Sequence, residues 1–267
     1  MTITQLHFSR NKFELVAYRG GAGERPENTI CAFQNAADTF SDVILDLDLQ
    51  FTFDKRVVVF HDDTLDRTTN GSGRVRDHSL RELQEFDAGF HFKIGDGSFP
   101  FRGNSEAKIV ELDDVLSSFP NQRILLDIRF HDYAFIYRIL ETVKRFNASS
   151  RCVIMSESSQ SIRLSRKLQP DMNFAASAFE VRALFFGSKI GLSGLIPSKS
   201  SHFMIPETHN GMKILTDEFY DQLRCRNKTV FVWTVDQIED AVRLQKIGID
   251  GIFTNFPNRL NVPADRF

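Results

Sequence analysis

The sequence lacks the features that mark membrane, secreted and nucleic-acid-binding proteins. Its hydrophobic runs stay well short of the roughly 20 residues that a membrane-spanning helix needs, and residues 1–13 contain no apolar core of signal-peptide length. Its three cysteines are widely separated and odd in number, so they do not make a disulfide framework. The 33 Lys and Arg residues nearly balance 35 Asp and Glu residues, whereas broad capture of nucleic acid requires a basic excess. We therefore expect a cytoplasmic protein without stable membrane insertion and without nucleic-acid binding.

Length and composition favour one globular domain over residues 1–267. The chain is 42% hydrophobic and 25% charged, which are ordinary values for a folded protein. A chain of this size can bury one large core, and its length is close to the roughly 250 residues of a typical TIM barrel. We find no internal repeat, low-complexity tract or linker that would divide it.

Strand-like and helix-like segments alternate along the chain. Eight short β-rich runs are predicted as strands: Glu14 to Tyr18, Val43 to Leu49, Arg123 to Arg129, Cys152 to Ser156, Asn173 to Ser177, Leu192 to Ile196, Val230 to Thr234 and Asp250 to Thr254. Helical patterns occur between them, at Thr29 to Thr39, Tyr133 to Phe146, Ser159 to Leu168, Asp217 to Cys225 and Gln237 to Lys246. This alternation predicts an α/β fold in which a parallel sheet closes as a TIM (β/α)8 barrel.

A ninth apolar run, Val57 to Phe60, interrupts this alternation. The turn before it is too short for a parallel crossover, which needs a dozen or more residues, so the run is predicted as a hairpin strand. The stretch that follows, up to about Lys108, is rich in glycine and other turn residues. We therefore expect an insertion after the second strand, at about residues 51–108, above the mouth of the barrel.

Charged residues occur inside two of the predicted strands. Because strand side chains alternate between two faces, Asp46 and Asp48 project from one face, and Asp127 and Arg129 share a face of another strand. Each acid taken singly fits a residue that caps a helix or meets an arginine. Buried ionised groups are costly unless they are paired or bound to metal, so the three acids together favour a divalent cation. Oxygen ligands favour Mg²⁺, Ca²⁺ or Mn²⁺.

One histidine stands out among the seven by its context. His61 directly follows the apolar run of the hairpin strand, whereas the others lie in polar or loop-like stretches. Strand ends are where barrel enzymes carry their catalytic groups, and a histidine exchanges protons near neutral pH. We interpret His61 as a proton-transfer residue, with a purely structural histidine as the alternative.

The first predicted strand ends in Tyr18-Arg19-Gly20-Gly21. Glycines allow the backbone to approach a ligand closely, and the planar donor group of Arg19 suits phosphate oxygens. A tight loop between a strand and a helix would have the same composition. Asn28 or Thr29 is expected to cap the next helix.

Several of these strings resemble the glycerophosphodiester phosphodiesterase family. They are Arg19-Gly20-Gly21, Pro26-Glu27-Asn28-Thr29, Asp46-Leu47-Asp48, His61-Asp62-Asp63-Thr64-Leu65-Asp66-Arg67-Thr68-Thr69-Asn70-Gly71, Val232-Trp233-Thr234-Val235-Asp236 and Gly248 to Pro257. Each string alone is weak, but their combination over about residues 14–260 is specific.

The resemblance implies a TIM barrel that cleaves glycerophosphodiesters, as small-molecule substrates, to glycerol 3-phosphate and an alcohol with one divalent cation. Asp46, Asp48 and Asp127 would hold the metal. Arg19 and Arg129 would face the phosphate, and His61 would act as acid or base. By the same resemblance, Trp233 would wall the glycerol side of the pocket, with ordinary barrel packing as its alternative. Glu207 would be a solvated loop acid, or would reach the mouth.

Three departures from the family pattern bear on function. Tyr18 stands where the family has its first histidine. Asp46 and Asp127 stand where the family has glutamates, and Arg129 where it has a lysine. Charge is retained throughout, so the sequence favours a metal-dependent phosphodiesterase whose proton transfer is altered. The alternatives are a phosphodiester-binding protein that has lost turnover, and a related phosphodiester lyase or transferase.

Overall fold

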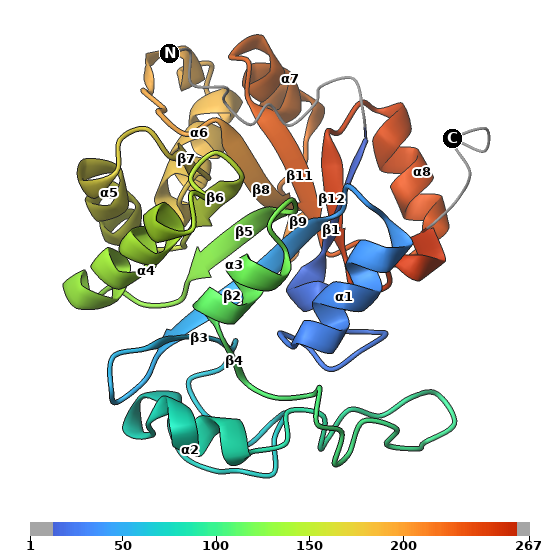
Figure 1. Cartoon of the computed structure of the whole chain (residues 1–267). Helices are drawn as coiled ribbons and strands as arrows, with labels where there is room; N and C mark the ends of the chain where they lie inside the picture. The colour runs from blue at the N-terminus through green and yellow to red at the C-terminus, as the bar shows by residue number, and fades with distance from the viewer. Residues whose placement is uncertain (1–12, 261–267) are drawn as a thin grey trace.

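Eight parallel strands form a ring in the computed structural model, which describes residues 13–260 (Figure 1). They are β1 (Glu14–Ala17), β2 (Ile44–Phe51), β5 (Arg123–Ile128), β6 (Cys152–Met155), β7 (Asn173–Phe174), β8 (His202–Pro206), β11 (Thr229–Trp233) and β12 (Gly251–Thr254). Their order is β7-β6-β5-β2-β1-β12-β11-β8. A parallel bridge between Ala175 and His202 joins the two ends of this path. The predicted TIM barrel is therefore confirmed.

The alternation of side chains along the strands separates two cores. One set fills the inside of the ring and includes Val16, Ile44, Leu125, Phe231 and Phe253. The residues on the opposite face of the strands face the helices; on β2 these are the fully buried leucines at positions 45, 47 and 49. Each strand is thus buried on both faces, as parallel sheets require.

The helices surround the ring. They are α1 (Ile30–Thr39), α3 (Leu112–Ser118), α4 (Tyr133–Arg145), α5 (Ser159–Leu168), α6 (Ala178–Lys189), α7 (Asp217–Cys225) and α8 (Ile238–Lys246), with α2 (Leu80–Glu85) in the insertion. All five predicted helices are present. Neither α3 nor α6 was predicted, and α6 lacks the usual amphipathic pattern because Phe179 and Phe186 on it are exposed. No helix within residues 13–260 is long and apolar enough to cross a bilayer.

The predicted strand at Leu192 to Ile196 is wrong. This stretch follows Gly191, whose φ of 70° is left-handed, and it forms the short 3₁₀ helix η3 (Ser193–Leu195). The missing barrel strand is β8, further along the chain. Its first residue, His202, looked like a loop residue in sequence because serines precede it, but the side chain is buried and its Nδ1 lies 2.7 Å from Oγ1 of Thr229. Tertiary burial thus outweighs local polarity at this strand.

The insertion begins with the predicted hairpin. Strand β3 (Val57–Val59) pairs antiparallel with β2 and with β4 (Val110–Glu111). Between β3 and β4 lie a 3₁₀ turn, η2 (Val75–Asp77), and helix α2, which share a small apolar core. Figure 1 shows α2 beside the barrel ring, away from the other helices. A second hairpin, β9 (Thr208–His209) with β10 (Met212–Lys213), follows β8. The predicted domain limits and the stretch used to exclude a signal peptide lie outside the described residues.

Candidate active site

The carboxylates of β2 and β5 lie on the inside of the ring, beyond the level at which the carboxyl end of β1 is reached. Ile44 and Leu125 belong to the interior core, so the residues two and four positions later also point inward. The strands pair in register, with Asp48 beside Asp127 and Asp46 beside Leu125. The structure therefore brings together the acids that the sequence placed on strand faces. Barrel enzymes carry their sites at this end.

Burial and mutual repulsion perturb these acids. The pKa of Asp46 is raised well above its usual value, first by burial and then by the neighbouring charges of Asp48 and Asp127. Burial and Asp48 raise the pKa of Asp127 to about 6, against the lowering effect of Arg129. The three carboxylates thus share one small, poorly solvated region, where their combined charge favours a cationic partner.

Two arginines and an asparagine contact the same acids. Arg129 Nη1 lies 2.8 Å from Asp127 Oδ2 and 3.7 Å from Asp48 Oδ1. Arg19 donates its backbone N–H to Asp46 at 3.2 Å, and its Nε lies 3.5 Å from Asp48 Oδ2. Asn28 also donates to Asp48, at 2.9 Å. Both predicted phosphate-binding arginines therefore lie against the acidic group.

A metal ion would have to displace some of these contacts. Among residues 13–260, no group of three or more Asp, Glu, His or Cys side chains is arranged as a metal site. The donor set nevertheless suits a hard divalent cation, because it consists of carboxylate oxygens with unbalanced negative charge. The oxygen donors of the site therefore fit a divalent cation, although the three carboxylates now contact arginines.

Tyr18 lies in the turn that follows β1. Its hydroxyl accepts a hydrogen bond from Arg19 Nη2 at 2.9 Å, and its ring packs edge-on against Phe253 of the interior. Burial raises the pKa of Tyr18 above 10, and Asp46 and Asp48 raise it further, against Arg19. The phenol therefore keeps its proton at neutral pH and can serve as a donor but not as a base.

His61 enters the site from the β2–β3 hairpin. Strand β3 pairs with the upper part of β2 on the side opposite β5, beyond the point where β1 ends. The N–H of Phe60 donates to the backbone carbonyl of Asp48 at 2.8 Å. His61 therefore follows directly after a residue that is bonded to the backbone of one of the site acids. Nδ1 of His61 lies 2.5 Å from Asp62, and the side chain of Gln50 donates to the backbone carbonyls of both residues.

Comparison with known proteins agrees with this geometry. The model of the glycerophosphoryl diester phosphodiesterase family matches residues 19–259. This chain belongs to that family. A glycerophosphodiester phosphodiesterase of Caldanaerobacter subterraneus subsp. tengcongensis is 30% identical over 251 residues, covering 92% of this chain and 95% of that protein. One of Bacillus altitudinis is also 30% identical, covering 92% and 96%. The predicted family and hydrolase class are confirmed.

Solved structures show the same fold. The glycerophosphoryl diester phosphodiesterase domain of an uncharacterized Mycobacterium tuberculosis protein superposes with a TM-score of 0.80 at 20% identity, covering 93% of this chain and 97% of that one. An Oleispira antarctica phosphodiesterase, solved in complex with the product sn-glycerol-3-phosphate, gives a TM-score of 0.73 at 20% identity, covering 92% and 94%. These structural similarities show that the barrel fold is shared.

Two further residues singled out from the family resemblance lie in different places. Trp233 ends β11 two residues after the interior Phe231, so it lies at the mouth and is 39% exposed. The Trp233–Thr234 peptide bond is cis. Glu207 instead forms a two-pronged ion pair with Arg243 of α8, at 2.9 and 2.7 Å. Glu207 is therefore engaged by a helix outside the ring.

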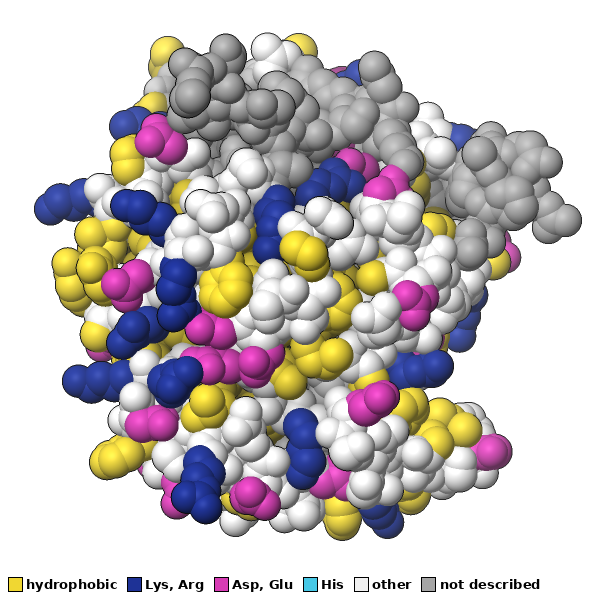
Figure 2. All heavy atoms as spheres, in the orientation of Figure 1, with side chains coloured by type: hydrophobic (Ala, Val, Ile, Leu, Met, Phe, Trp, Pro, Cys, Tyr) yellow, Lys and Arg dark blue, Asp and Glu magenta, His cyan; other side chains and the backbone are white. Residues whose placement is uncertain are grey.

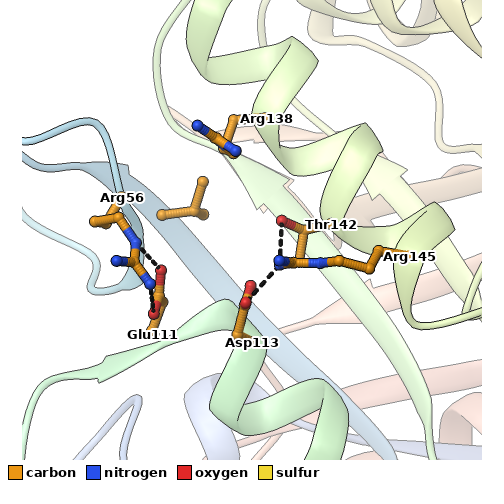
Figure 3. A pocket seen from close by; sticks show the side chains of 7 residues that line it. Arg56, Glu111, Asp113, Arg138, Thr142 and Arg145 are labelled. Atoms are coloured by element: carbon orange, nitrogen blue, oxygen red, sulfur yellow. Dashed lines mark hydrogen bonds and ion pairs between the residues drawn. The ribbon is translucent and has the colours of Figure 1, made fainter.

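Two cavities of the described part lie outside the ring. One, of about 300 Å³, lies between the β2–β3 hairpin, α3 and α4. Figure 3 shows that arginines and acids line it, with Arg56 bound to Glu111 and Arg145 bound to Asp113 and Thr142. The other, of about 400 Å³, lies beside α7 and α8. On the face shown in Figure 2, basic and acidic side chains are interspersed, in keeping with the balanced charge.

The sequence analysis did not assign site roles to Glu27, Asn28 and Gln50, although the sequence around each gave a signal. Thr29 caps α1 by accepting from Ala32, as one of the two expected capping residues. Asn28, the other, instead donates to Asp48 from a left-handed backbone with φ of 59°. Glu27, in the same string, binds Arg19. Gln50 continues the alternation of Asp46 and Asp48 by one more step, which places it where it can hold the hairpin.

Proposed function

We propose that this chain cleaves glycerophosphodiesters to glycerol 3-phosphate and an alcohol with the help of one divalent cation. The observation that carries this proposal is the cluster of three acids on the inner faces of β2 and β5, which Arg19 contacts from the turn after β1 and Arg129 from the end of β5. Family membership supplies the reaction class, and the Oleispira antarctica relative was solved with glycerol 3-phosphate. A small glycerophosphodiester is therefore the proposed substrate.

Asp46, Asp48 and Asp127 are the proposed ligands of the cation, which would be Mg²⁺ or Ca²⁺, with Mn²⁺ also suitable. Support comes from their burial, their raised pKa values at Asp46 and Asp127, and their oxygen-only donors. When bound, the ion would neutralise diester charge and stabilise the transition state. The glutamates that the family resemblance led us to expect are aspartates here, one methylene shorter.

Arg19 and Arg129 are the proposed phosphate-binding groups. Both already face carboxylates, so a phosphate that enters the site meets two guanidinium groups held in place. Planar guanidinium donors match phosphate oxygens and stabilise negative charge as it develops. Trp233, exposed at the mouth, is placed to cover the glycerol part of the substrate.

His61 is the proposed proton-transfer residue. It would protonate the departing alcohol, or deprotonate the attacking group. That group is either water or the neighbouring glycerol hydroxyl, which would give a cyclic phosphate first. Tyr18, whose raised pKa keeps the hydroxyl protonated, would contribute a hydrogen-bond donor in place of the second acid/base residue expected in the family.

Tyr18 also favours a second candidate function, a phosphodiester-binding protein that has lost turnover. Its raised pKa removes a base from the site, and loss of one acid/base group typically costs about 10²- to 10⁴-fold in rate. A related lyase or transferase reaction fits an altered proton-transfer pair as well. Location in the cytoplasm stays a prediction.

Turnover of glycerophosphocholine distinguishes these candidates. Wild type, Tyr18→His and His61→Ala would be assayed with Mg²⁺, Ca²⁺ or Mn²⁺ and with a chelator. We expect metal-dependent turnover by wild type that His61→Ala abolishes. Turnover by Tyr18→His alone would instead favour the binding protein, and full activity of His61→Ala would contradict the role given to His61. Release of a cyclic phosphate would indicate the lyase reaction.

A further inference from the structure

Five side chains form a continuous chain of contacts from His61 to Arg19. His61 Nδ1 lies 2.5 Å from Asp62 Oδ1, and Arg67 Nε donates to Asp62 Oδ2 at 2.6 Å. The two Nη atoms of Arg67 donate to the two carboxylate oxygens of Glu27 at 2.8 and 2.7 Å. Glu27 in turn accepts from Arg19 Nη1 at 3.1 Å. Nitrogen-bearing side chains and carboxylates alternate along the chain.

The chain of contacts joins two loops that are separate in sequence. Arg19 and Glu27 belong to the loop after β1, whereas His61, Asp62 and Arg67 belong to the loop after β3. Arg67 is the link, because it binds one carboxylate from each loop. A planar guanidinium that grips two carboxylates fixes direction as well as distance, which an ammonium group does not.

Asp62 also decides which nitrogen of His61 exchanges protons. Two donors, Arg67 and His61, lower the pKa of Asp62 to about 2, although burial opposes them, so the carboxylate stays ionised and only accepts. Nδ1 of His61 must then carry its proton toward Asp62. The other nitrogen, Nε2, is thereby set as the one that exchanges protons with a substrate.

We propose that Arg67 is a positioning residue that holds His61, through Asp62, at a fixed place relative to the phosphate-binding Arg19. This inference rests on the proposed function of His61 and Arg19. The side chain of Arg67 is 48% exposed, but its two-pronged contact with Glu27 has the geometry of a strong, direction-fixing ion pair. Its partners Asp62 and Glu27 are much less exposed than Arg67. Removal of the Arg67 side chain would therefore mainly change how these two carboxylates, and with them His61 and Arg19, are held.

The test compares Arg67→Met with a matched control, Arg138→Met. Arg138 is 50% exposed and also ion-paired, but it lies on α4, beside the cavity of Figure 3. Both variants would be assayed on glycerophosphocholine, whose alcohol needs a proton to leave, and on the p-nitrophenyl ester of glycerol phosphate, whose leaving group does not. Thermal melting would show that both variants are folded.

We expect Arg67→Met to lower kcat on glycerophosphocholine by about 10- to 100-fold, part of the usual range for an acid/base group, with a much smaller loss on the p-nitrophenyl ester. KM should change little. Arg138→Met should match wild type on both substrates. Equal losses on the two substrates would support the positioning role with His61 as the base for the attacking group, and no loss on either substrate would overturn the proposal.

A second measurement is independent of turnover and therefore separates this proposal from the proposed function. The ¹⁵N shifts of the His61 ring, assigned with His61→Ala, report which nitrogen carries the proton. We expect the Nδ1–H form in wild type and in Arg138→Met, and a mixture of tautomers in Arg67→Met. A His61 spectrum unchanged by Arg67→Met would overturn the positioning role even if the enzyme is active, and a changed one would support it even if wild type is inert.

Discussion

At the scale of single residues, the Arg19-Gly20-Gly21 turn shows why its residue types are needed. All three residues have left-handed φ values, of 51°, 83° and 91°. A Cβ on Gly20 would lie 2.9 Å from Ala32 and Phe33 of α1, so glycine is required there. Arg19 accepts an unfavourable backbone conformation, which directs its N–H to Asp46 and its side chain to Asp48.

The acids allow a prediction at the same scale. Asp48 contacts both arginines and neighbours Asp127 across the strands, so Asp48→Asn removes the charge at the centre of the proposed metal site. We expect the affinity for Mn²⁺, measured by isothermal titration calorimetry, to fall by more than about tenfold, the scale on which even outer-shell partners act.

Asp171→Asn is the matched control for this substitution. Asp171 is exposed after α5, and the same change there should leave Mn²⁺ binding as in wild type. Equal Mn²⁺ affinity in Asp48→Asn and wild type would exclude Asp48 as a ligand.

At the scale of elements, the hairpin β2–β3 determines where His61, the proposed proton-transfer residue, lies. β1 pairs with the lower part of β2, and β3 takes its place alongside the upper part. The valines of β3 are buried, and the side chain of Gln50 donates to the backbone carbonyls of His61 and Asp62. The β2–β3 hairpin, which is not part of a regular barrel, thus carries the catalytic candidate His61.

Helix α4 offers a test of local stabilisation. Asp132 caps this helix by accepting from the N–H of Phe135 at 2.8 Å. Asp132→Ala should lower the free energy of unfolding by about 1 kcal/mol, because it leaves that donor without its capping partner. Urea unfolding measures the change, with Asp171→Ala as the control. No difference between the two variants would show that the cap does not stabilise the fold.

At the scale of the whole molecule, closure of the ring between β7 and β8 buries a histidine. His202 is 4% exposed, and burial together with Lys228 lowers its pKa to about 3. The unfolded chain binds a proton below the ordinary pKa of about 6.5, but the folded chain does so only near 3. The stability from neutral His202 is therefore complete above pH 6.5 and is lost as the pH falls toward 3.

This burial predicts acid sensitivity of the fold. Between pH 7.5 and 5.5 the His202 contribution to the free energy of unfolding should fall by about 1 kcal/mol. Urea unfolding of wild type and His202→Asn at both pH values isolates this part, because the other titrating groups are shared. The same pH dependence in both proteins would exclude His202 as its source.

The barrel class, the family and the faces on which the charged residues lie could all be predicted from the amino-acid sequence. Side-chain alternation along a strand is local, so Asp46, Asp48, Asp127 and Arg129 could be assigned to faces without coordinates. Helical stretches were predicted from local pattern as well, whereas Leu192 to Ile196 was wrongly predicted as a strand because apolar residues alone do not distinguish a strand from a 3₁₀ turn.

Which charged groups contact one another could be seen only in the folded chain. The barrel strand β8 begins with the polar His202, whose burial depends on partners far along the chain. The link from His61 through Arg67 to Glu27 and Arg19 joins two loops, and its geometry follows from the register of β3 against β2. Local pattern fixes the direction of a side chain, but contacts between distant segments depend on how the ring closes.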